Sequence, residues 1–209
     1  MKEDPEQIVF VVDDDESMRA ALTYLFTSMN LHVEVFSTAT AFLESKLPNI
    51  ASCLVLDVRL PGVNGLEFQD VLAKAGIHIP IVFMTGHGDI PMSVKAMKAG
   101  AIDFLPKPFR DQDMLDAVAM AIERDRKRRE SDKDAADLQT HFETLTSRER
   151  DILALVSSGL MNKQVAAELG LAEITVKIHR GHIMKKMGAK SLADLVMKAE
   201  TLGIRRTKL

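Results

Sequence analysis

The stretch Ile8-Val-Phe-Val-Val-Asp-Asp14 places two carboxylates directly after a short run of apolar, mostly β-branched residues. Continuous runs of this kind are typical of strands that are buried on both faces of a parallel sheet. A second run, Cys53-Leu-Val-Leu56, leads in the same way into Asp57. Ligands of open parallel sheets bind beyond the carboxyl ends of the strands, so we expect Asp13, Asp14 and Asp57 to share one edge.

Two further polar residues also follow predicted strands. Thr85 comes after Ile81-Val-Phe-Met84, and Lys107 closely follows Phe104-Leu105. Three carboxylates form an oxygen-rich site that suits Mg²⁺, and an aspartate can act as a nucleophile toward phosphorus. A metal ion, an ammonium group and a hydroxyl offset the charge of an incoming phosphoryl group. The pattern predicts a phosphoryl acceptor, and Asp57 is the expected nucleophile because the other two carboxylates are adjacent and suit a metal ion.

Short apolar runs alternate with helical periodicity from Ile8 to about residue 122. The expected strands are 8–12, 32–36, 53–56, 80–84 and 103–105. The expected helices are 16–29, 38–47, 64–75 and 90–99, with a fifth from Arg110. Ser37 is the expected N-cap of the second helix. Five strand–helix units predict an α/β domain with a doubly wound, five-stranded parallel sheet over residues 1–122.

The strand signals end before the last third of the chain. Residues 123–144 are dense in charge and lack Gly and Pro, so they form either a disordered linker or a helical extension, which their composition favours. Residues 145–209 are expected to form a second, smaller, all-α domain. Ser147 is the expected N-cap of its first helix, although Arg150 stands where a capping box has Glu. The expected helices are 147–158, 162–169, 173–186 and 191–202.

Charge is distributed unevenly along the chain. Residues 1–122 hold 9 Lys and Arg against 17 Asp and Glu, whereas residues 147–209 hold 12 against 6. This asymmetry suggests a regulatory module attached to a module that meets a polyanion. Cys53 is the only cysteine, which excludes a disulfide framework and predicts a buried thiol. The sequence lacks a membrane-length apolar stretch and a signal-like N-terminus, so we expect a cytoplasmic protein without a membrane partner.

Five separated motifs occur in order within residues 7–122. They are Val12-Asp-Asp14, Leu56-Asp-Val-Arg-Leu-Pro-Gly62 with Gly65, Thr85-Gly86, Ala99-Gly-Ala101 and Phe104-Leu-Pro-Lys-Pro-Phe109. Together they resemble the receiver domain of bacterial two-component response regulators. The resemblance implies that a sensor histidine kinase phosphorylates Asp57. The Mg²⁺ ligands that it implies are Asp13, Asp14, Asp57 and the backbone carbonyl of Arg59.

The same resemblance implies a conformational switch. Thr85 and Phe104 form the implied switch pair, and Lys107 contacts the phosphoryl group. The Lys107–Pro108 peptide bond is expected to be cis. Because Phe104 lacks a hydroxyl, its choice between an inward and an outward position depends on packing alone.

Residues 145–202 carry a second set of motifs. They are Leu145-Thr-Ser-Arg-Glu-Arg150, Gly159 with Asn162-Lys163, Val165-Ala-Ala-Glu-Leu169, Thr175-Val-Lys-Ile-His179, Met184-Lys-Lys-Met187 and Lys190-Ser191. This part resembles the LuxR-type helix-turn-helix domain, and the whole chain is similar to FixJ-like members of the NarL/FixJ family. The resemblance implies binding to double-stranded DNA. It also implies dimerisation through residues 191–202, for which packing within the monomer is a competing role.

The helix expected over 173–186 is the candidate recognition helix, which presents one face to DNA and packs on a core with the other. The expected apolar stripe is Ile174, Ile178, Ile183 and Met184. The expected outward contacts are Thr175, Val176, Lys177 and Arg180, with added charge from Lys185 and Lys186. The family resemblance places Lys177 and Ile178 near base edges, and Lys163 and Lys190 near phosphates.

His179 and His182 lie three residues apart in the same predicted helix. Residues at this spacing are neighbours on one helical face, so the two rings could form a metal-binding pair. Neither a cysteine nor a further acid is near them in the sequence, and a role in helix packing is therefore the stronger interpretation.

We expect a transcriptional regulator and not an enzyme. Phosphorylation of Asp57 is expected to promote homodimerisation and sequence-specific DNA binding, with RNA polymerase as a further partner. One alternative is a phosphatase of the haloacid dehalogenase type, but such enzymes place an acid two residues after the nucleophile, where this chain has Arg59. Another is a phosphotransfer relay without DNA binding, which the positive charge of residues 147–209 disfavours.

Overall fold

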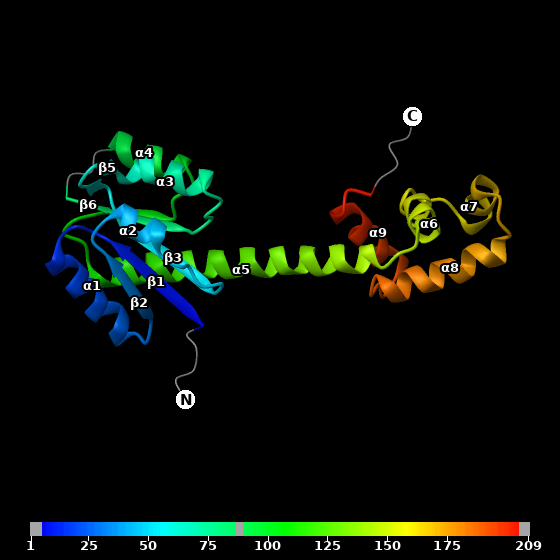
Figure 1. Cartoon of the computed structure of the whole chain (residues 1–209), viewed down its shortest axis with the longest axis horizontal. Helices are drawn as coiled ribbons and strands as arrows, with labels where there is room; N and C mark the ends of the chain where they lie inside the picture. Colours follow the sequence, from blue (N-terminus) through cyan, green and yellow to red (C-terminus); the bar gives the residue numbers. More distant parts are fainter. Residues whose placement is uncertain (1–5, 87–89, 205–209) are drawn as a thin grey trace. The chain divides into compact units, whose positions relative to one another are not determined.

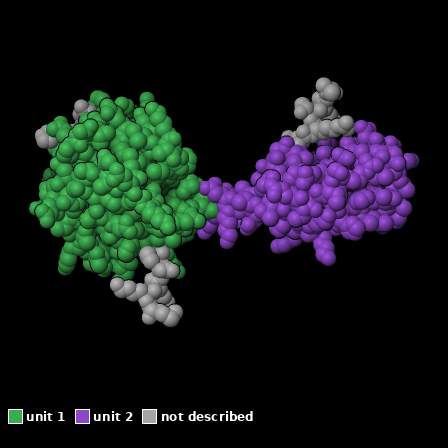
Figure 2. All heavy atoms as spheres, viewed as in Figure 1, with its two compact units in different colours: residues 1–129 green, residues 130–209 purple. Residues whose placement is uncertain are grey.

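The computed structural model describes residues 6–86 and 90–204, and the chain divides into two compact units, Met1–Arg129 and Glu130–Leu209 (Figure 2). The first unit contains a sheet with helices on both faces, and the described residues of the second unit form helices (Figure 1). Each unit has hydrophobic core residues of its own. The expected fold class, a doubly wound five-stranded parallel sheet with a smaller all-α domain, is confirmed.

The sheet of the first unit has five parallel strands in the order β2-β1-β3-β6-β7. The strands are β1 (Gln7–Val12), β2 (His32–Phe36), β3 (Ala51–Asp57), β6 (Ile81–Thr85) and β7 (Asp103–Pro106). The helices are α1 (Glu16–Ser28), α2 (Ala39–Glu44), α3 (Gly65–Lys74), α4 (Ile90–Lys98) and α5 (Asp111–Glu143). The strand order reverses between β1 and β3, and ligands of open α/β sheets bind at the carboxyl ends of strands at such a point.

Alternate residues of the central strands enter two separate cores, because successive side chains of a strand point to opposite faces. Phe10 and Leu54 belong to a core that includes Phe42 of α2 and residues of α3. Val11 and Cys53 belong to the other core, with residues of α1 and α5. Burial on both faces explains the unbroken apolar runs of β1 and β3. Cys53 is fully buried, as expected, and burial raises the pKa of its thiol.

Two details of the first unit differ from the sequence-based expectations. A short antiparallel hairpin, β4 (Arg59–Leu60) with β5 (Val63–Asn64), follows the sheet strand β3. Helix α2 is shorter than expected: its N-cap is Thr38, whose hydroxyl accepts a hydrogen bond from Ala41 N–H at 3.1 Å, and Ser45 already has an extended backbone. Proline at position 48 disfavours a helical conformation of Leu47, which argues against the expected helix end at residue 47.

A buried carboxylate ties α5 to the start of β3. Asp125 is 0% exposed, and its Oδ2 accepts hydrogen bonds from the Ser52 backbone N–H at 3.0 Å and from Arg129 Nε at 2.6 Å. Arg128 Nη2 donates to Oδ1 at 2.7 Å. The guanidinium groups of Arg128 and Arg129 and the Ser52 N–H compensate the buried negative charge of Asp125. A buried charge without such partners would be strongly destabilising.

The described part of the second unit contains the C-terminal part of α5 and four further helices, all close to the expected bounds. They are α6 (Ser147–Ser157), α7 (Asn162–Leu169), α8 (Glu173–Lys186) and α9 (Leu192–Thr201). Their shared core includes Ile152 and Leu153 of α6, Val165 of α7, Ile183 of α8 and Leu195 of α9. Throughout residues 6–86 and 90–204, every helix is too short or too polar to cross a bilayer.

The start of α6 differs from the expectation by one residue. The N-cap is Thr146 and not Ser147, and it forms a complete capping box with Glu149. The Thr146 backbone N–H donates to Glu149 Oε2 at 2.8 Å, and Glu149 N–H donates to the Thr146 hydroxyl at 3.3 Å. The expectation of an incomplete box was wrong because it used the wrong first residue of the motif.

The buried face of α8 also differs from the expectation. Val176 and Ile183 are each 0% exposed, whereas Ile174 and Ile178 are 63% and 53% exposed. The expectation that Val176 makes an outward DNA contact is therefore wrong. Val176 and Ile183 are seven residues apart and lie on one face because a helix repeats every 3.6 residues, and this face packs on the core.

We predict that Asp125→Ala lowers the free energy of unfolding of the first unit by about 2–4 kcal/mol, because it leaves the Ser52 N–H buried and unpaired and two arginines without their anion. Urea denaturation followed by far-UV circular dichroism measures this loss. The matched control is Asp134→Ala, which removes an exposed aspartate from the same helix. Equal stability of the two variants would contradict the assigned role of Asp125.

Glu149 predicts an acid dependence of stability in the second unit. Burial disfavours its charged form, but hydrogen bonds from Lys186 and Thr146 outweigh burial and lower the pKa of the carboxyl to about 2, from 4.5. A group with a lowered folded-state pKa stabilises the native state above its unfolded pKa and loses this contribution as the pH falls. The stability difference between the parent chain and Glu149→Gln is therefore largest above pH 4.5 and shrinks toward pH 2.

Chemical denaturation at a series of pH values tests this dependence, with Glu130→Gln as an exposed control in the same unit. A difference between the parent chain and Glu149→Gln that stays constant with pH would contradict it.

Candidate functional site

Three carboxylates meet at the carboxyl edge of the sheet. Asp13 and Asp14 follow β1, and Asp57 ends β3, which runs parallel to β1 with Val12 opposite Leu56. One oxygen from each carboxylate lies within 4.8 Å of the others. Asp13 is 0% exposed and Asp57 is 7% exposed, whereas Asp14 is open to solvent. The expectation that these residues share one edge is confirmed.

Lys107 bridges two of these carboxylates. Its Nζ donates to Asp57 Oδ2 at 2.6 Å and to Asp13 Oδ2 at 2.7 Å. The backbone N–H of Lys107 donates to the Thr85 carbonyl at 2.7 Å, and the Lys107–Pro108 peptide bond is cis, as expected. The loop after β7 thus delivers a cation to the ends of β1 and β3.

The electrostatic environment shifts the pKa of two of these groups. Burial raises the pKa of Asp13, although hydrogen bonds from Lys107 and the Asp15 N–H act in the opposite direction. Burial acts to lower the pKa of Lys107, but its contacts with Asp13 and Asp57 outweigh burial and raise it. Lys107 therefore remains a cation, and it offsets the repulsion between the carboxylates.

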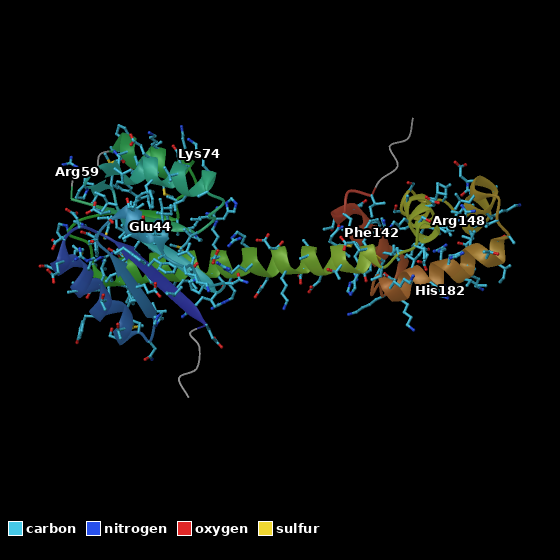
Figure 3. The ribbon with its side chains drawn as sticks, in the orientation of Figure 1. Glu44, Arg59, Lys74, Phe142, Arg148 and His182 are labelled. Carbon is cyan, nitrogen blue, oxygen red and sulfur yellow. The ribbon has the colours of Figure 1, made fainter. Side chains whose placement is uncertain are left out.

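Two backbone features orient Asp57. The backbone N–H of Arg59 donates to Asp57 Oδ1 at 2.9 Å, so the second carboxylate oxygen also has a partner. Helix α3 begins at Gly65, where a Cβ atom would lie 2.6 Å from the Asp57 carbonyl oxygen and 2.9 Å from Val58 Cα. Only glycine allows the helix to start this close to the strand. Arg59, labelled in Figure 3, has an exposed side chain in the hairpin that follows.

The sequence analysis missed two residues that position Asp13. The Asp15 backbone N–H donates to Asp13 Oδ1 at 2.8 Å, and Arg19 Nη1 donates to the Asp13 carbonyl at 2.7 Å. Asp15 is also the N-cap of α1, since its side chain accepts from Ser17 N–H at 2.8 Å. The sequence signal for Arg19 was its position: it is a polar residue one turn into the helix that follows Asp13 and Asp14.

Thr85 and Phe104, the expected switch pair, lie on neighbouring strands. Thr85 ends β6 and is fully buried. Phe104 is half-buried in β7, opposite Phe83, and the two ring centroids are 6.3 Å apart. The structure brings Thr85 close to the site through its carbonyl contact with Lys107. Phe104 has a ring neighbour on the strand beside it, so its packing can respond to movement of that strand end.

The donor chemistry of the pocket fits Mg²⁺. Asp13, Asp14 and Asp57 offer only oxygen ligands, which hard divalent cations prefer, and together they form the acidic pocket typical of a receiver Mg²⁺ site. Mg²⁺ usually keeps several water ligands, and the exposed Asp14 leaves one side of the pocket open to water. That the Arg59 carbonyl completes the ligand set stays a prediction.

The residues expected to contact DNA lie on α7, on α8 and before α9. Lys163, Lys177, Ile178 and Lys190 are exposed, and Thr175 and Arg180 are half-buried. The Arg180 guanidinium donates to Asn162 Oδ1 of α7 and so joins the two helices. The exposed cations of this group are available to a polyanion, whereas Val176, as described above, faces the core.

Both units match known protein families. Residues 9–119 match the response regulator receiver domain, and residues 143–199 match the bacterial regulatory proteins of the luxR family. Among solved structures, the one of the response regulator StyR covers 93% of this chain and 98% of its own, with a TM-score of 0.83 at 50% identity.

Relatives match along nearly the whole length. The chain is 65% identical to Nodulation protein W of Bradyrhizobium diazoefficiens over 197 residues, which cover 94% of this chain and 87% of that protein. It is 41% identical to the transcriptional regulatory protein FixJ of Rhizobium meliloti over 192 residues, covering 91% and 94%. The chain therefore belongs to the NarL/FixJ family of two-component response regulators, DNA-binding transcription factors that join a receiver to a LuxR-type helix-turn-helix domain and are not catalytic enzymes.

Proposed function

We propose that phosphorylation of Asp57 by a sensor histidine kinase switches this protein to a homodimer that binds duplex DNA in the cytoplasm. A receiver domain implies a histidine kinase partner, and a LuxR-type domain implies DNA binding. The observation that supports Asp57 as the acceptor is its place beside Asp13 and Lys107, with Lys107 Nζ at 2.6 Å from its Oδ2. RNA polymerase is the further partner on which the DNA-bound dimer acts.

The proposed step is a phosphoryl transfer between side chains. An Asp57 carboxylate oxygen attacks the phosphorus of a phosphohistidine, an O–P bond forms, the P–N bond breaks and the imidazole leaves. Mg²⁺ held by Asp13, Asp14, Asp57 and the Arg59 carbonyl would neutralise part of the phosphoryl charge. Lys107 supplies a second positive charge, and the Thr85 hydroxyl donates to a phosphoryl oxygen.

The added charge is expected to redistribute the contacts of Lys107. The Lys107 ammonium then interacts with the phosphoryl oxygens as well as with the carboxylates. The hydrogen bond from the Lys107 backbone N–H to the Thr85 carbonyl connects this change to the end of β6. Phe104, one strand away, repacks in response. The repacking of Phe104 alters the surface formed by α4, β7 and α5. On α4, the side chains of Ile90, Val94 and Met97 are 80%, 45% and 46% exposed. A second copy of the receiver covers such apolar side chains in the proposed dimer.

The second unit is the one that we propose contacts DNA, because it contains the LuxR-type domain and exposed cations. Lys163 and Lys190 are the proposed phosphate contacts, because both are exposed cations near helix starts. Lys177 and Ile178 are exposed on α8 and are the proposed base-edge contacts. A dimer presents two copies of α8 to successive half-sites.

We predict that Asp57→Asn abolishes both the labile phosphoryl adduct and the gain in dimerisation and DNA affinity on treatment with acetyl phosphate and Mg²⁺. An amide cannot form the acyl phosphate. Intact-mass spectrometry, light scattering and gel-shift titration measure the three effects. Asp70→Asn, at an exposed aspartate of α3, is the matched control. If Asp57→Asn still dimerises and gains DNA affinity with the phosphodonor, the proposal is wrong.

We predict that Lys163→Ala and Lys190→Ala weaken binding to all duplexes and reduce the slope of log K against log salt by about 0.9 for each phosphate that is no longer neutralised. Lys177→Ala is expected instead to reduce discrimination between cognate and unrelated duplexes. Fluorescence anisotropy at several salt concentrations measures both effects. The control is Lys74→Ala in α3 of the receiver (Figure 3). Unchanged slopes for both Lys163→Ala and Lys190→Ala would refute the assigned phosphate-binding roles.

A further inference from the structure

A second cluster of potential metal ligands lies within the DNA-binding unit. Glu149 comes from α6, and His179 and His182 come from α8. One ligand atom from each of these residues lies within 4.8 Å of the others. The sequence analysis favoured a packing role for the two histidines because no acid is near them in the chain. Helix packing supplies that acid, since α6 lies against α8 in the shared core.

The carboxylate of this cluster is already oriented by its neighbours. Glu149 is 3% exposed, and its Oε2 accepts hydrogen bonds from Thr146 N–H at 2.8 Å and from Lys186 Nζ at 2.7 Å. Within the described part of the chain, no hydrogen bond is formed to Oε1. Glu149 therefore offers an ionised oxygen whose direction is set by groups outside the cluster, as in protein metal sites with a supporting outer shell.

The two histidines differ in their surroundings. His179 is half-buried, and its Nδ1 is buried without a hydrogen-bond partner in the described structure. Buried polar atoms nearly always have a partner, so an unpaired imidazole nitrogen calls for an explanation such as an ion. His182 is exposed, and its ring centroid is 6.4 Å from that of His179. One side of the cluster is thus open to solvent, which gives an ion a route in.

We propose that Glu149, His179 and His182 bind a divalent transition-metal ion of the Zn²⁺ class. Two imidazole nitrogens and one carboxylate oxygen form a donor set that Zn²⁺ accepts in a tetrahedral site, with water as the fourth ligand. Imidazole donors favour Zn²⁺ over Mg²⁺, so the site is chemically distinct from the all-oxygen pocket of the receiver. Lys186 is a competing cation, because it shares the Glu149 carboxylate.

The consequence of such a site would be a cross-link between α6 and α8. Helix α8 also carries Lys177 and Ile178, the proposed base-edge contacts. An ion that joins the two helices stabilises the folded unit by its binding free energy and holds α8 in one orientation. This effect is independent of Asp57, so the proposal does not rest on the phosphorylation switch.

The test is Zn²⁺ titration of the full-length, tag-free, chelator-treated protein by calorimetry, together with NMR of the histidine side chains. We expect the ring resonances of His179 and His182 to shift at stoichiometric Zn²⁺ before those of the other histidines. His182→Asn is expected to weaken Zn²⁺ binding by about tenfold or more, because it removes one ligand at an exposed position and leaves the core intact. His141→Asn, at an exposed histidine of the same unit, is the matched control and keeps parent affinity.

Two results would overturn the proposal. One is an absence of His179 and His182 shifts at stoichiometric Zn²⁺, with binding confined to the receiver pocket. The other is equal Zn²⁺ affinity and stoichiometry in the parent chain and in His182→Asn. Co²⁺ provides a second readout, because a tetrahedral site with nitrogen ligands produces intense visible absorption, which His182→Asn is expected to remove and His141→Asn to retain.

Discussion

The ammonium of Lys107, held between Asp13 and Asp57, is the interaction on which the receiver site depends. Parallel strands bring the two carboxylates to one edge, where both are buried and repel each other. A cation at 2.7 and 2.6 Å offsets this repulsion. Because the same residue bonds the Thr85 carbonyl through its backbone, the charge balance of the pocket is connected to the end of the neighbouring strand β6.

Buried carboxylates with cationic partners recur at other places where distant segments meet. Asp125 joins α5 to β3 through Ser52, with two arginines as counterions. Glu149 joins the start of α6 to α8 through Lys186. In each case the carboxylate also accepts a backbone N–H: Asp125 accepts from the buried Ser52 N–H, and Glu149 accepts from the N–H of Thr146, the N-cap of α6. A buried carboxylate of this kind restricts how a helix or strand packs more than an apolar contact does, because its hydrogen-bond donors must lie at a defined distance and direction.

Much of the fold and of the receiver site could be predicted because their signals are local. A buried parallel strand is visible in the sequence as an apolar run, and the acid at its end is the residue that follows, so the sequence alone predicted that Asp13 and Asp57 lie at the same edge of the sheet. The wrong predictions concern positions where two nearby residues have similar properties and only one of them has the predicted role. Thr146 and Ser147 are both good N-caps, but only Thr146 stands three residues before Glu149, so the capping-box spacing was a sequence signal that the prediction overlooked. Val176 and Ile178 are both apolar, and only the direction of α8 against its core shows that the first is buried.

By itself, the sequence determined the α/β character of the receiver, the helical character of the C-terminal unit and the residue types at the sheet edge. These follow from periodicity and from motifs contained in short segments. The tertiary structure alone decided which face of α8 packs on α6, α7 and α9, that Asp125 of α5 pairs with Ser52 of β3, and that Glu149 lies beside His179 and His182. Those relations join residues from different elements, and side-chain packing in three dimensions, not spacing along the chain, sets the distance between them.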